Sequence, residues 1–251
     1  MVNAIDKAFL ILEKIVSTDL PAIPPAQLAD SLNLNRATCS RILKQLTDMG
    51  YTVKVSRQQG YAAGPKLHTM GTLCNYSAQL LRYGIPIVDR CAAELHGSVL
   101  ISRLCAGRRY VLYHRNCNPD MRVHINKPAY DDVFATATGL TLAAWSSKSE
   151  RESCFKLQKK SGSRFMDDYS RPENLHAKLD EIREKGGIEI TGGCQCLYAY
   201  PVKFRQEGDT AIGMSILQSQ YTPELHKKIQ KTLRSAAAEL SCSTDNELII
   251  S

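Results

Sequence analysis

The chain has 251 residues, of which 43% are hydrophobic and 23% charged, a composition typical of a globular protein and not of a disordered one. No stretch approaches the roughly 18 apolar residues of a membrane-spanning helix, and the N-terminal segment carries acids within its apolar region, unlike a signal peptide. We therefore expect a cytoplasmic protein. The net charge of +7 is only mildly basic, so the position of the charge is more informative than its total.

The first part of the chain predicts three helices followed by a hairpin. Pro25 suits the first turn of a short second helix, Asn33 the left-handed turn after it, and Asn35 the N-cap of a third helix that Gly50 ends. The segments "YTVKV" and "YAAGP" around the polar turn "SRQQG" then read as two strands. This order predicts a winged helix-turn-helix over residues 1–65. The expected inner face of the first helix consists of Ile5, Ala8, Phe9, Leu12, Ile15 and Val16.

The third helix has an apolar stripe on one side and a basic, small-residue face on the other. The stripe comprises Cys39, Ile42, Leu43, Leu46 and Met49. Side chains near the N-terminus of such a helix read base edges in the major groove, and a basic hairpin tip can reach the DNA backbone or minor groove. For any single arginine or lysine, the alternative is an ordinary solvated helix face. The candidate DNA-binding residues are Arg36, Ala37, Thr38, Ser40, Arg41 and Lys44 on the helix, and Arg57 at the hairpin tip.

The remainder of the chain predicts a linker helix and a second domain. A helix over residues 66–83 would serve as linker or dimer helix, and Pro86 would open the next helix. In the expected domain of residues 84–251, "VLISRLC" and "YVLYHR" form a hairpin, and "MRVHI" adds a short strand. A helix begins near "ATATG" and two polar helices follow. "CLYAYPVKF" and "TAIGMSIL" form a central hairpin, and an amphipathic helix closes the chain. The fold class is α+β with a mostly antiparallel sheet.

Several of these segments together resemble the IclR-type transcriptional regulators. The matching stretches are "AIDKAFLILEKI", "PAQLADSLNLNRATCSRILKQLTDMGY" and "GYAAGPKL", followed more loosely by "ATATG", "LDEIREKGG" and "YPV…AIGMSI". The resemblance implies a C-terminal domain of GAF-like topology that binds a small effector such as a carboxylate, aromatic or sugar-acid metabolite. It also implies homodimers, often paired into tetramers, that bind palindromic double-stranded operators.

The resemblance also suggests which residues contact the effector. A helix N-terminus with unpaired N–H groups suits a carboxylate. Taken singly, Met121, Val123 and Leu197 fit a plain core better than a binding site, and Thr136 could be only a cap. The chain departs from the family in its short segment before "YPV" and in Leu140, where the family commonly has Lys. By position, the candidate effector-binding residues are Met121, Val123, Ala135, Thr136, Gly139, Leu197 and Ser215.

Two other classes of function remain alternatives. Cys194 and Cys196 could bind a metal together with a histidine (His96, His114 or His124) or sense redox state, although Cys-x-Cys is a weak signal. An enzyme is disfavoured, since the chain has no phosphate-binding loop and no Gly-x-Ser-x-Gly motif. We therefore expect no catalytic residues, metal or cofactor, no membrane partner, and an effector-responsive repressor of a metabolic operon.

Overall fold

The computed structural model describes residues 3–56, 58–73, 78–166, 169–204 and 206–245. The chain divides into two compact units, Met1–Ala78 with Ile125–Pro128, and Gln79–His124 with Ala129–Ser251. Among the residues described, no helix is both long and apolar enough to cross a bilayer.

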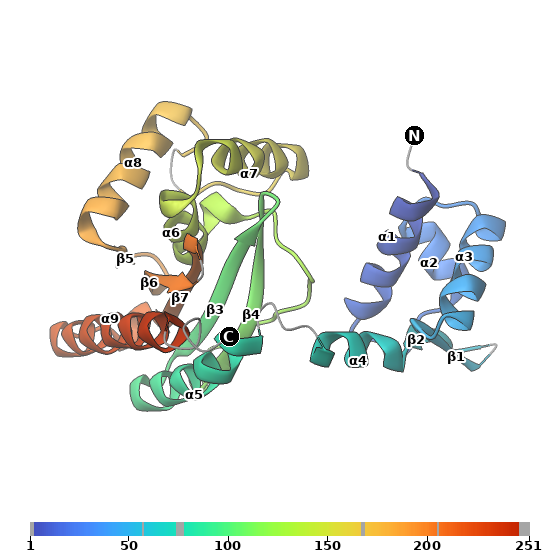
Figure 1. Ribbon diagram of the computed structural model, residues 1–251, viewed down its shortest axis with the longest axis horizontal. Helices are drawn as coiled ribbons and strands as arrows, with labels where there is room; N and C mark the ends of the chain where they lie inside the picture. Colours follow the sequence, from blue (N-terminus) through green and yellow to red (C-terminus); the bar gives the residue numbers. More distant parts are fainter. Residues whose placement is uncertain (1–2, 57, 74–77, 167–168, 205, 246–251) are drawn as a thin grey trace. The chain divides into compact units, whose positions relative to one another are not determined.

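The first unit is a winged helix-turn-helix, as the sequence predicts (Figure 1). Its two strands pair antiparallel. Its core includes Ile15 from the first helix, Leu28 from the second and Leu43 from the third. The elements are α1 (Ala4–Val16), α2 (Pro25–Ser31), α3 (Arg36–Asp48), β1 (Thr52–Ser56), β2 (Gly60–Ala63) and α4 (Pro65–Leu73).

Helix α1 packs with a face that only partly overlaps the predicted one, since Ile15 is buried and Ala8 packs against the core. Ile11, absent from the expected stripe, is fully buried together with Ile15, whereas Ile5, Phe9 and Val16 are exposed. The helix has apolar residues on two adjacent faces, and the periodicity alone selects a stripe that runs across both. The prediction for Ile5, Phe9 and Val16 is therefore wrong within this chain.

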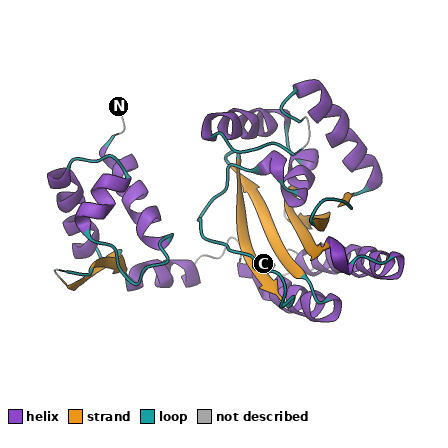
Figure 2. Cartoon of the chain, turned by 180° about the vertical axis from the view of Figure 1, so that it is seen from behind, coloured by secondary structure: helices purple, strands orange, loops and turns teal. Residues whose placement is uncertain are grey.

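The second unit is a five-stranded antiparallel sheet with helices on both faces (Figures 1 and 2). The strand order is β4-β3-β7-β6-β5. Its elements are α5 (Ala78–Leu95), β3 (Ser98–Cys105), β4 (Arg108–Asn116), the 3-10 turn η1 (Val133–Ala135), α6 (Ala137–Trp145), α7 (Lys148–Ser161), α8 (Pro172–Lys185), β5 (Ile188–Ile190), β6 (Gln195–Phe204), β7 (Gln206–Leu217), η2 (Gln218–Gln220) and α9 (Pro223–Asp245).

The two faces of this sheet bury separate cores. Alternate residues of β3, β6 and β7, such as Val99, Tyr198 and Met214, pack against α5 and α9. On the opposite face, Ala199 and Ala211 pack with α6 and α8. The polar positions of the second face therefore lie beside α6, where the effector residues are expected.

Two local predictions differ from the structure. Pro86 lies inside α5 and does not begin a helix. The cost of a proline within a helix is about 3 kcal/mol, which the buried face of α5, including Leu80, Val88 and Leu95, offsets through packing. The segment "MRVHI" is not a strand, since residues 121–127 have no regular pairing, so Met121 and Val123 lie on an irregular segment.

Candidate DNA-binding face and effector site

The turn before α3 is built from two asparagines, as their positions predict. Asn33 adopts a left-handed conformation with φ of 51°, which Asn tolerates better than most residues. The Asn35 side chain accepts hydrogen bonds from the Ala37 and Thr38 backbone N–H groups at 2.9 and 3.3 Å. Asn35 is thus the N-cap that fixes where α3 begins.

The polar face of α3 points to solvent. Cys39, Ile42, Leu43 and Leu46 are buried on the other side, but Met49, predicted in the same stripe, is 55% exposed. It lies at the C-cap, after the last helical turn. Of the candidate contacts, Thr38 is half-buried, and Arg36, Ala37, Ser40, Arg41 and Lys44 are exposed.

Arg36 is the one candidate on α3 with an ion pair in the described structure. Its Nη2 lies 3.4 Å from Asp30 Oδ2 on α2, and both side chains are mostly exposed. Such a pair contributes little, about 0–1 kcal/mol, so a phosphate could displace it. Arg57 lies outside the described residues, and its role at the hairpin tip stays a prediction.

The wing is anchored by a close backbone approach. Ile23 and Tyr61 exchange backbone hydrogen bonds of 2.8 and 3.0 Å. Gly60 has φ of +93°, and a Cβ there would overlap the Ile23 carbonyl. Only glycine fits this position. The close approach that it allows holds β2 against the segment that precedes α2.

In the second unit, the sheet brings three predicted effector residues together. Leu197 of β6 and Ser215 of β7 are directly paired. The Ser215 hydroxyl lies 3.9 Å from the sulfur of Met121, although these residues are 94 positions apart. Met121 is buried, and the irregular segment that carries it thus lies against this face of the sheet.

The first turn of α6 lies beside the same face. Thr136 Oγ1 accepts a hydrogen bond of 3.1 Å from the Gly139 N–H and caps the helix. A Cβ at Gly139 would overlap the Val133 carbonyl, and one at Gly213 of β7 would overlap Thr138. Thr136 and Gly139 therefore have structural roles as cap and close contact. Val123 and Ala135 are half-buried.

A polar pair that sequence reasoning did not assign to the effector site lies on the adjoining strands β3 and β4. Ser98 of β3 is paired with Ser215, and its hydroxyl lies 2.7 Å from His114 Nε2 on β4. Burial lowers the pKa of His114, which favours a neutral imidazole that can accept or donate a hydrogen bond. Neither residue stands out in the sequence, since β3 also carries Ser102 and Arg103 and β4 ends in Arg115 and Asn116.

Asn116 places Met121 over the sheet. Its side-chain amide donates hydrogen bonds to the carbonyls of Met121 at 2.6 Å and Asn118 at 3.2 Å. The sequence does not indicate this contact, because the pattern of the irregular segment is that of a strand.

Four of the described cysteines are buried, namely Cys39, Cys91, Cys154 and Cys196, whereas Cys105, Cys194 and Cys242 are exposed. Cys196 is buried, and burial raises its pKa, whereas Cys194 is exposed. Burial also raises the pKa of Cys91 to about 11 and that of Cys154 to about 12. In the described part of the chain, no three Cys, His, Asp or Glu side chains gather as metal ligands do.

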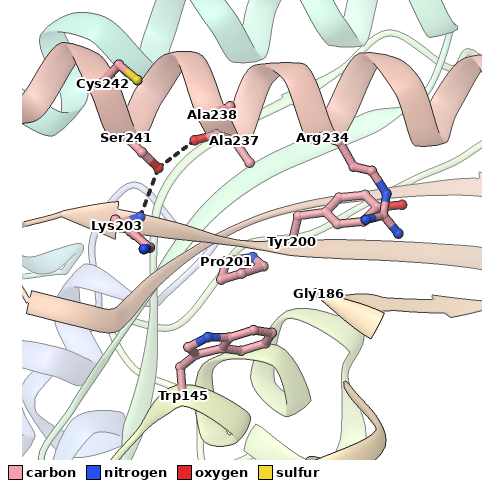
Figure 3. Close-up of a pocket in the computed structure, with 10 residues that line it drawn as sticks. All are labelled: Trp145, Gly186, Tyr200, Pro201, Lys203, Arg234, Ala237, Ala238, Ser241 and Cys242. Atoms are coloured by element: carbon pink, nitrogen blue, oxygen red, sulfur yellow. Dashed lines mark hydrogen bonds between the residues drawn. The ribbon is translucent and has the colours of Figure 1, made fainter. Parts of the chain in front are cut away.

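Two cavities of the second unit lie away from the predicted effector residues. One, of about 400 Å³, lies beside β6 and α9 (Figure 3). The other, of about 270 Å³, lies between α7 and α8. Neither is lined by any of the seven predicted effector residues.

Comparison with family models supports the two-domain interpretation. Residues 21–51 match the winged helix-turn-helix DNA-binding model. Residues 74–242 match the model of the bacterial transcriptional regulator IclR C-terminal domain. No curated protein sequence gives a significant match.

Solved structures of similar fold cover nearly the whole chain. An IclR-type regulator from a Silicibacter species has a TM-score of 0.76 at 20% identity, covering 95% of each chain. An IclR homolog from Microbacterium hydrocarbonoxydans, in complex with 4-hydroxybenzoate, has a TM-score of 0.78 at 14% identity, covering 97% of this chain and 100% of that one. The IclR of Thermotoga maritima has a TM-score of 0.64 at 17% identity, covering 97% and 99%. The matched models and structures are those of transcriptional regulators and not of enzymes.

Proposed function

The chain belongs to the IclR family of bacterial transcriptional regulators, and we propose that it is a cytoplasmic repressor of a metabolic operon. It binds a palindromic operator as a homodimer, or as a tetramer of paired dimers, and a small effector in the second unit changes its DNA affinity. The observation that carries the proposal is the solvent-facing polar side of α3, which lies opposite the buried Cys39, Ile42, Leu43 and Leu46.

Helix α3 is proposed to enter the major groove with its first two turns. The small side chains of Ala37 and Ser40 allow close approach to the base edges, and Arg41 is long enough to reach a guanine in bidentate fashion. Lys44 and Arg36 supply positive charge toward phosphates. Thr38, half-buried beside the cap, suits a backbone phosphate contact at the helix N-terminus.

The exposed face of α1 supports the dimer. Ile5, Phe9 and Val16 follow helical spacing and are 67%, 60% and 51% exposed. An apolar stripe of this kind on a helix is costly in water and is typical of a surface that packs against another protein. A second copy of the chain is the proposed occupant, because two-fold pairing would present two copies of α3 to successive major grooves.

The sheet face around Ser215 is proposed as the effector site. Ser215, Ser98 and neutral His114 offer hydrogen-bonding groups, while Leu197 and Met121 supply apolar contact. Val123, Ala135, Thr136 and Gly139 border it in the proposal. The 4-hydroxybenzoate bound to the Microbacterium homolog makes small carboxylates the first compounds to test here.

The test combines footprinting with a ligand titration. DNase footprinting upstream of the protein's own gene should reveal two protected half-sites whose centres lie roughly 34–36 Å, or a multiple of this, apart. Saturating effector should then change operator affinity, typically by about 5–150-fold. A chain that protects no sequence, or whose operator affinity no small acid or sugar acid alters, contradicts the proposal.

A further inference from the structure

The sheet has an uncovered stretch at one edge. Strand β5 pairs with β6 only from Leu197 to Ala199, whereas β6 continues to Phe204. Beyond Ala199, the cavity of about 400 Å³ lies between α9 and the C-terminal end of α6 (Figure 3). Its volume falls within the roughly 300–1,000 Å³ of small-molecule sites.

This edge is poorly suited to the addition of another strand. Pro201 has no N–H to donate to a ladder. The Lys203 backbone N–H donates to Ser241 Oγ of α9 at 3.0 Å, and Ser241 in turn donates to the Ala237 carbonyl at 2.7 Å. The cavity therefore suits a small molecule better than an extended peptide.

The walls of the cavity are apolar and cationic. Trp145, the only tryptophan of the chain, and Pro201 provide flat apolar surfaces, and in Figure 3 Pro201 lies between Trp145 and helix α9. Arg234 and Lys203 are its charged residues, and no acid is among those that line it. The lining is Trp145, Gly186, Tyr200, Pro201, Lys203, Arg234, Ala237, Ala238, Ser241 and Cys242.

Arg234 lines the cavity and is held there by three contacts. Its guanidinium lies 4.7 Å from the centre of the Tyr200 ring, and its Nη2 lies 3.4 Å from both Glu189 Oε1 and the Lys185 carbonyl. Glu189 Oε1 also accepts a hydrogen bond of 2.5 Å from the Tyr200 hydroxyl. Because the contacts of Arg234 are long for charge-assisted hydrogen bonds, a carboxylate placed closer would compete well.

We propose that this sheet-edge cavity binds a small aromatic carboxylate. The ring packs against Trp145 and Pro201, the carboxylate pairs with the Arg234 guanidinium, and the charge of Lys203 adds to the attraction. Because no lining residue belongs to the proposed effector site, this is a second ligand site, distinct from the one around Ser215.

The single tryptophan makes the proposal directly testable. Benzoate titrated into the full-length protein, with tryptophan emission excited on the red edge of its absorption, should give a saturable change in fluorescence. Benzamide, its neutral isostere, should bind at least roughly tenfold more weakly, since a hydrogen-bonded charge contributes about 1.5–3 kcal/mol. A linear, unsaturable response to benzoate, or equal affinity for the two compounds, overturns the proposal.

Substitutions separate this cavity from the site around Ser215. Arg234→Gln should weaken benzoate binding roughly tenfold and leave benzamide unchanged. Lys231→Ala, which removes an exposed positive charge on the same helix outside the cavity lining, should alter neither titration. Trp145→Ala leaves Arg234 and its contacts intact. Because this variant lacks the tryptophan, its benzoate affinity is measured by calorimetry, and it should also be lower than that of the parent protein. Unchanged benzoate affinity in either cavity variant places the ligand elsewhere and overturns the proposal.

Discussion

The two units of this chain build their candidate sites in opposite ways. The DNA-binding face of the first unit comes from one helix and the turn before it, so its residues are neighbours in sequence. The candidate effector site of the second unit joins Met121 to Ser215 across 94 positions. A site of the first kind depends on helix periodicity and capping, whereas one of the second kind depends on sheet register and on close contacts between distant segments.

The largest expected effect tests whether the first unit depends on its packed stripe. Leu43 is fully buried in α3, so Leu43→Ala should lower the free energy of unfolding of the first unit by about 2–5 kcal/mol. Met49→Ala, on the exposed end of the predicted stripe, should change it by less than about 0.5 kcal/mol. Urea denaturation measures both, and equal losses would mean that Met49 is packed after all.

The next substitution tests the close contacts of the second unit. Gly139→Ala inserts a methyl group against the Val133 carbonyl and should cost roughly 1–3 kcal/mol of stability through overpacking. Gly71 lies in α4, and a methyl group added there would meet only open space, so Gly71→Ala should instead stabilise the first unit by about 0.5–1 kcal/mol. Thermal unfolding distinguishes the two variants. If Gly139→Ala leaves the stability unchanged, then η1 moves aside at little cost in free energy.

Loss of the cap tests the local character of the first site. Asn35→Ala removes two hydrogen bonds to the α3 N-terminus and should cost about 0.5–2 kcal/mol of stability. Operator affinity should fall as well, because the same turn carries Ala37 and Ser40. Asn35→Ser, which keeps a capping oxygen, should recover most of both losses in parallel denaturation and binding measurements.

The smallest expected effect concerns pH and the second unit. Because burial lowers the pKa of His114 in the folded state, the unfolded chain binds the proton more readily. The contribution of neutral His114 is fully present above its unfolded pKa of about 6.5 and is lost as the pH falls below that value. His114→Gln should reduce the loss of unfolding free energy as the pH falls, measured by denaturation over mildly acidic pH. An unchanged pH dependence would mean that other groups cause it.

Particular residues show how far the sequence could predict these sites. Asn33, Asn35 and Gly50 shape only the turn and helix ends within a few residues of their own positions. The conformations expected of them are present. Ile11 escapes prediction because two apolar faces of α1 overlap in sequence, and periodicity cannot tell which face meets a partner.

The second unit shows the limit more clearly. Ser98 is the cross-strand partner of Ser215, and its hydroxyl reaches His114 on β4. Both contacts follow from strand order and register, which no local pattern specifies. The cavity at the edge of β6 exists because β5 is only three residues long, and that strand was not predicted.

The most direct test of the central claim is a binding measurement with Arg41→Ala on the footprinted operator. It should weaken binding by about 1–3 kcal/mol and relax the preference at one base position. Lys14→Ala removes an exposed positive charge near the end of α1. It should leave the preference for that DNA base intact and should weaken operator binding much less. If Arg41→Ala binds the operator as tightly as the parent protein, with the same base preference, then α3 does not read the DNA as proposed.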